Sequence, residues 1–129
     1  MRMNEPGRWP HGTPERLAEY EELMRSGLAV DVTHKAPKWF SGPVAIEASC
    51  YDRLVAWHAE AQRRLRLHLD EAQRLVHMLD ASGIAITSTG GCFICKAVDA
   101  AGRDVQPERH VLTLTNYGGP SQPAWLIHG

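Results

Sequence analysis

The chain has 129 residues, of which 43% are hydrophobic and 22% are charged, and its formal net charge is −1 with histidine neutral. This length suits one domain with a real core, and the near-balanced charge argues against general electrostatic binding to nucleic acid or to an anionic membrane. No apolar run approaches the ~20 residues that a membrane-spanning helix needs.

The N-terminus and the cysteines bear on the cellular compartment. Residues 1–12 contain two arginines but no apolar segment of the kind found in a signal peptide, so we expect a cytoplasmic protein. Three cysteines is an odd number, and a reducing compartment disfavours disulfides. We therefore expect no disulfide framework.

The first predicted element is a short helix that follows a flexible lead-in. Prolines and glycines recur through residues 1–12, and we expect a single α+β domain to span residues 13–129. Thr13 is a favourable N-cap with Pro14 at the first helical position, and Gly27 ends the helix.

An aromatic loop lies between two short predicted strands, at residues 28–32 and 44–47. The loop, residues 33–43, carries Trp39 and Phe40 between two prolines. Aromatic side chains in such a loop either fill the core or form a recognition surface. Large aromatic side chains are usually buried, but both interpretations stay open.

A long helix is the central prediction. Residues 50–81 contain no glycine or proline, Ser49 is a favourable N-cap and Gly83 is a plausible stop. Unbroken, this helix is about 48 Å long at ~1.5 Å per residue, whereas a compact chain of this size is roughly 35 Å across. One end is expected to project, and a second copy is the usual cover for such an end. We therefore expect a homo-oligomer formed through the long helix.

The C-terminal third predicts strands. The hydrophobic period changes to two after Gly83, and residues 110–116 alternate clearly. Residues 92–98 are apolar on both faces apart from Lys96, which is consistent with a central strand. A hairpin turn at residues 99–102 and a last strand at residues 124–128 complete an antiparallel sheet of about four strands. The predicted fold class is α+β, with a short N-terminal helix and one long central helix packed on this C-terminal sheet.

The pattern Cys92-x-x-Cys95 is the sharpest local signal. Two cysteines at this spacing can bind zinc, with His110 and His128 as the remaining ligands. Against this, His128 lies too far from His110 for a finger pattern, and residues 92 and 95 of a strand face opposite sides. The alternative interpretation is that both cysteines are small buried hydrophobic residues, without a redox role.

A second polar candidate is the segment Thr87-Ser88-Thr89 and the two glycines that follow it. Its backbone N–H groups could hold an anion or a phosphate. The segment lacks the Gly-Lys-Ser/Thr ending of a P-loop, and a turn between strands needs no ligand.

No catalytic motif of the common hydrolases or metalloproteases is present. We therefore predict a non-enzymatic, cytoplasmic homo-oligomer that binds a protein, as an inhibitor or adaptor, or a small ligand, without a cofactor. The predicted contacts lie in or beside loops with glycine and proline: Trp39, Phe40, Tyr117 and Trp125. The alternative is a small zinc-binding module, associated with nucleic acid, although nucleic acid is not the favoured partner.

Overall fold

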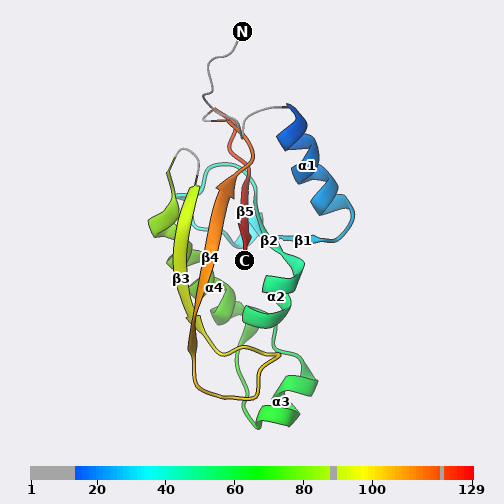
Figure 1. Cartoon of the computed structure of the whole chain (residues 1–129), viewed down its shortest axis with the longest axis vertical. Helices are drawn as coiled ribbons and strands as arrows, with labels where there is room; N and C mark the ends of the chain where they lie inside the picture. Colours follow the sequence, from blue (N-terminus) through cyan, green and yellow to red (C-terminus); the bar gives the residue numbers. More distant parts are fainter. Residues whose placement is uncertain (1–13, 88–89, 120) are drawn as a thin grey trace.

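A computed structural model describes residues 14–87, 90–119 and 121–129 (Figure 1). The expected lead-in, Ser88 and Thr89 lie outside these residues. The helices and strands follow in chain order: α1 (Pro14–Arg25), β1 (Ala29–Asp31), η2 (Thr33–Lys35), β2 (Val44–Glu47), α2 (Ala48–Leu54), α3 (Ala59–Leu65), α4 (Glu71–Ser82), η3 (Gly83–Ala85), β3 (Gly90–Ala97), β4 (Glu108–Asn116) and β5 (Trp125–His128).

The five strands form one mixed sheet in the order β1-β2-β5-β4-β3. The α+β class is confirmed, but the prediction of about four antiparallel strands is corrected, because β2 and β5 run parallel. This pair forms where Trp125 N donates to Pro43 O at 2.8 Å. The two short N-terminal strands thus extend the C-terminal sheet. The alternation just after Gly83 belongs to η3 and not to a strand.

The prediction of one long central helix is wrong, because the segment folds as α2, α3 and α4. The first break follows Val55, and His58 is extended as the N-cap of α3. At the second break Arg66 is left-handed, with φ 53°, and Asp70 caps α4 by accepting from Ala72 N at 3.0 Å. The premise of a helix too long for its globule is therefore lost, and the argument for an oligomer formed through that helix is lost with it.

Side chains hold these breaks without any glycine or proline. The guanidinium of Arg74 on α4 donates to Val55 O at 2.8 Å and to Arg53 O at 3.0 Å. It also reaches the end of β3, where it donates to Val98 O at 2.9 Å. The indole N–H of Trp57 donates to Leu67 O at 2.8 Å. Carbonyls that an unbroken helix would satisfy are thus bound by distant side chains.

The sheet has helices on both faces, but they cover the two faces unequally. On one face α2 and α4 bury the main core, which includes Ile46, Leu79 and Leu114. On the other face α1 packs on β1, β2 and β5, where Tyr20 contacts Leu126 and its neighbours. Figure 1 shows α1 beside the half of the sheet formed by β1, β2 and β5, whereas β3 and β4 form the other half. The half of this face formed by β3 and β4 carries exposed apolar residues.

Candidate binding surface

The structure brings three of the four predicted aromatic contacts together and places Tyr117 apart from them, beside Tyr20. Phe40 and Trp125 are buried and meet edge to face, with ring centroids 6.0 Å apart, and Trp125 Nε1 donates to Ser41 O. Trp39 is 47% exposed and stacks on Phe40 at 4.7 Å. Tyr117 is half-buried, with the guanidinium of Arg16 4.2 Å from its ring centre. Three of the four thus form one cluster in which only Trp39 offers a large exposed surface.

The predicted polar turn is closed by its own first residue. The hydroxyl of Thr87 donates to Gly90 O at 2.7 Å and accepts from Gly90 N at 3.0 Å. Ser88 and Thr89, predicted beside it, lie outside the described residues. The hydroxyl of Thr87 is therefore already used within the turn.

The four predicted zinc ligands do not converge. Cys92 is exposed and Cys95 is buried, on opposite faces of β3, and burial raises the pKa of the Cys95 thiol. His110 lies across from Cys95, with Nε2 3.2 Å from Ala97 O, and His128 Nε2 lies 2.9 Å from the Thr115 hydroxyl. Within residues 14–87, 90–119 and 121–129, no group of three or more His, Cys, Asp or Glu side chains is placed to hold a metal ion.

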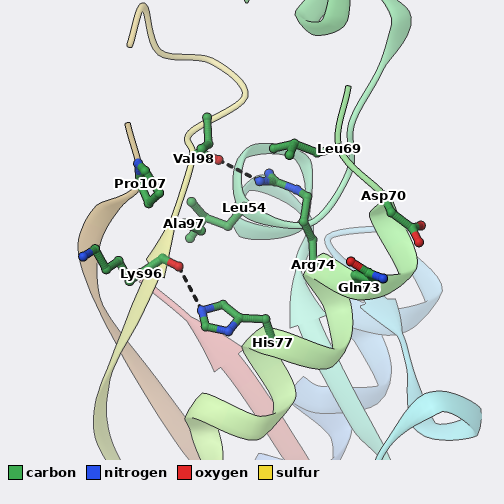
Figure 2. A pocket seen from close by; sticks show the side chains of 10 residues that line it. All are labelled: Leu54, Leu69, Asp70, Gln73, Arg74, His77, Lys96, Ala97, Val98 and Pro107. Atoms are coloured by element: carbon green, nitrogen blue, oxygen red, sulfur yellow. Dashed lines mark hydrogen bonds between the residues drawn. The ribbon is translucent and has the colours of Figure 1, made fainter. Parts of the chain in front are cut away.

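A cleft of about 200 Å³ lies between α4 and the end of β3 (Figure 2). Two of its polar side chains, Arg74 and His77, already contact backbone carbonyls. Arg74 donates to Val98 O, and His77 Nε2 lies 2.9 Å from Lys96 O. Figure 2 shows the side chain of Lys96 pointing away from His77. The hydrogen bonds across this cleft join α4 to the end of β3, and the bonded groups are not available to a ligand.

A wider hollow of about 630 Å³ lies between α1 and the loops around Pro43 and Pro123. Among the described residues that line it, the ionisable side chains are Tyr20 and Glu21, and the Tyr20 hydroxyl already donates to Trp125 O at 3.1 Å. Burial and then Asp31 raise the pKa of Tyr20 above its ordinary range. The remaining polar side chains among the described residues that line it are Ser41, Ser121 and Gln122, none of which is charged.

The uncovered half of the sheet presents a surface that the sequence interpretation missed. We call it the open face. It consists of alternate residues of two neighbouring strands: Cys92, Ile94 and Lys96 of β3, and Arg109, Val111 and Thr113 of β4. Ile94 lies directly opposite Val111, and their exposed fractions are 49% and 69%.

Charge on the open face has one sign. Lys96 lies directly opposite Arg109, and none of the six side chains is acidic. Like charges directly opposite each other on a sheet are destabilising, and an exposed aliphatic pair gains nothing from burial within the chain. Residues that break local rules in this way often serve a function.

The signal for this surface was partly visible in the sequence. The alternation of residues 110–116 correctly predicted that Val111 and Thr113 lie on one face of the strand and Leu112 and Leu114 on the other. Residues 92–98 were interpreted as a central strand buried on both faces, whereas β3 is an edge strand with one open face. The alternation of Ile94 and Lys96 with Phe93 and Cys95 is the pattern that indicates one exposed side.

Two further findings frame the function. In the part of the chain that the structure describes, no helix has the length and apolar character needed to cross a membrane. Comparisons with family models, with curated proteins and with solved structures find no match to this chain.

Proposed function

We propose that this chain is a non-enzymatic protein that binds another protein through the open face. The observation that carries the proposal is the exposed Ile94–Val111 pair beside the basic Lys96–Arg109 pair. Burial of an aliphatic side chain of this size contributes about 1.5–3 kcal/mol. A partner that covers the pair with apolar side chains therefore gains affinity from a small area.

The basic pair defines the chemistry of the partner. Two cations placed side by side favour a surface that carries carboxylates, and such complementarity adds specificity and speeds association. Nucleic acid fits less well, because its binding depends mainly on the neutralisation of many phosphates. The open face carries two cations, next to an exposed aliphatic pair that phosphates would not cover. The partner we propose is a protein surface with apolar residues next to aspartate or glutamate.

A non-enzymatic function is supported by the state of two potential nucleophiles, the buried Cys50 and the half-buried Tyr51. Burial, followed by the neighbouring Glu47, raises the pKa of the Cys50 thiol to about 11. Burial, followed by Glu71, raises the pKa of the Tyr51 hydroxyl to about 12. A catalytic nucleophile is activated by the opposite shift or by an adjacent base, so neither group is prepared for catalysis.

A display library of random peptides tests the proposal. We expect selection on the immobilised protein to enrich peptides that combine apolar and acidic residues. The change Val111→Glu should weaken a synthesised binder at least tenfold, and Lys96→Glu with Arg109→Glu should remove its salt dependence. The matched control is Val76→Glu on α4, where a valine of similar exposure lies outside the open face.

The proposal is overturned if no peptide is enriched, or if Val111→Glu binds the selected peptides as well as the unchanged protein. Vesicles of phosphatidylglycerol and phosphatidylcholine, and duplex DNA, are measured in parallel. A third outcome is that the protein binds vesicles or DNA and no peptide, and loses that binding with Lys96→Glu and Arg109→Glu. In that case the ligand of the open face is the lipid or the DNA, and the proposed protein partner is wrong.

A further inference from the structure

The open face continues the surface on which α1 lies. Thr115 of β4 lies opposite Leu126 of β5, and Leu126 lies opposite Ala45 of β2, so these three residues share one face of the sheet. Tyr20 of α1 packs on Leu126 and Ala45, whereas Val111, two residues before Thr113 on the same face of β4, is exposed. Within the described part of the chain, this layer thus has a helix on one half and none on the other.

The size of the uncovered half matches one more helix. Two neighbouring strands lie about 4.8 Å apart and, with their side chains, form a strip about 10 Å wide, which is the diameter of an α-helix. The eight residues of β3 extend about 26 Å at ~3.3 Å per residue. A helix of about 18 residues has that length.

The edge of β3 is a poorer site, because neighbouring groups occupy both of its ends. Along a strand between two antiparallel neighbours, successive residues bond the two neighbours in turn. Tyr117 N, just after β4, donates to Ala124 O, so the odd-numbered residues of β4 bond β5 and the even-numbered residues bond β3. Even-numbered residues of β3 then direct their backbone groups outward. The backbone N–H and C=O of Gly90 both bond the hydroxyl of Thr87, and the Lys96 carbonyl lies 2.9 Å from His77 Nε2.

Only two outward residues, Cys92 and Ile94, remain between these closed ends. The segment η3 also lies against the start of β3, since a Cβ added at Gly91 would be 3.6 Å from Ala85 O. A partner strand would therefore gain few hydrogen bonds at this edge. The face of the strand, and not its edge, is the larger free surface.

From this geometry we infer that the partner contributes an amphipathic α-helix that lies on the open face, in the same layer as α1. Its apolar residues, spaced i, i+3 or i+4, and i+7, cover Ile94 and Val111. An acidic turn of the helix lies over Lys96 and Arg109. This inference rests on the proposed function and specifies the structure of the partner.

The conformation of a bound peptide tests the inference. The probe is the strongest synthetic peptide from the display selection, together with the same peptide carrying a central proline. We expect transferred nuclear Overhauser effects between amides of successive residues, typical of a helix, and amide shifts centred on Ile94 and Val111. The proline should weaken binding at least tenfold, because proline breaks a helix interior.

The outcomes separate the two proposals. A selected peptide that binds the open face in an extended form, with apolar residues at every second position, overturns the helix and leaves protein binding in place. A selected peptide whose shifts centre on Trp39 overturns the site for both proposals. Failure to select any peptide overturns the proposed function, and the helix with it.

Discussion

The guanidinium of Arg74 lies over the ring of Trp57, with 4.9 Å between Cζ and the ring centroid. The two residues belong to different segments, since Trp57 follows α2 and Arg74 lies in α4. Together they bond the carbonyls of Val55 and Leu67, one at each break of the helical region. These two hydrogen bonds satisfy carbonyls that lose their helical partners where the segment divides into three helices.

Replacing Arg74 by methionine should destabilise the protein by about 2–4 kcal/mol. The change keeps the aliphatic stem but leaves several half-buried carbonyls without a donor, and each hydrogen bond to a charged group contributes about 1.5–3 kcal/mol. Urea denaturation measures the loss. Arg63→Met, at an exposed position of α3, is the matched control and should change the free energy of unfolding by less than about 0.5 kcal/mol. Equal stability of the two variants would contradict this role of Arg74.

Proline substitution distinguishes three helices from one. Ala59 is the first residue of α3, and the preceding His58 is extended with ψ 159°, which is the conformation that a proline requires before it. Ala59→Pro should therefore be tolerated within about 1 kcal/mol. Gln62→Pro removes the bond from Gln62 N to His58 O and should cost about 3 kcal/mol or more. Thermal unfolding followed by circular dichroism compares the variants, and a similar large loss for both would favour an unbroken helix.

Local patterns predicted the elements whose stability is local. Pro14 as the first helical residue and Gly27 beyond the last turn bounded α1, and strict alternation placed β4. The breaks at Val55 and Arg66 could not be predicted in this way, because they depend on bonds between distant residues. Arg74 bonds Val55 O from 19 positions further along the chain, and Trp57 bonds Leu67 O from ten positions before it. The parallel pairing of β2 with β5 likewise joins residues about 80 positions apart, and no pattern within either strand encodes it.

Gly90 should be sensitive to any side chain. Its φ is +101°, and a Cβ at this position would lie 1.9 Å from Leu114 O on the neighbouring strand. Gly90→Ala therefore combines a disfavoured backbone conformation with a clash, and we expect a loss of more than about 2 kcal/mol. Gly119→Ala is the control, because nothing lies within 4 Å of its added Cβ. Urea midpoints that fall by equal amounts would show that β3 does not approach β4 as described.

Acid should weaken the bond between α2 and the loop after β3. Burial alone would raise the pKa of Asp99, but hydrogen bonds from Arg53 and from Ala101 N outweigh it, and the pKa lies below its ordinary value. A carboxyl whose pKa is lowered by folding stabilises the protein above its unfolded pKa of about 3.9, and this stabilisation is lost as the pH falls through the folded pKa. The destabilisation caused by Asp99→Asn should thus be largest above about pH 5 and shrink in more acid solution. Urea titrations at a series of pH values measure it, with the exposed Asp52→Asn as the control.

The candidate site was harder to predict than the fold. An aromatic residue in a loop suggests either burial or recognition, and only packing shows that Trp125 is buried and Trp39 is not. Whether a strand is central or at an edge depends on the order of the whole sheet. For this reason the exposed side of β3 was read as buried, although the alternation of Ile94 and Lys96 is present in the sequence.

Cysteine reactivity tests the two faces of β3 directly. Cys92 is exposed on the open face, whereas Cys50 and Cys95 are buried. With its pKa raised to about 11, roughly one Cys50 thiol in a thousand is ionised at pH 8, and the thiolate is the reactive form. An aromatic disulfide reagent should therefore modify one thiol per native chain rapidly, and Cys92→Ser should abolish this fast reaction. All three thiols should react in guanidinium chloride.

A bound partner peptide should slow modification of Cys92, because the helix that covers Ile94 and Val111 also covers the neighbouring thiol. Fast modification of Cys95 instead would mean that the faces of β3 are reversed, and the open face would then lose its apolar pair.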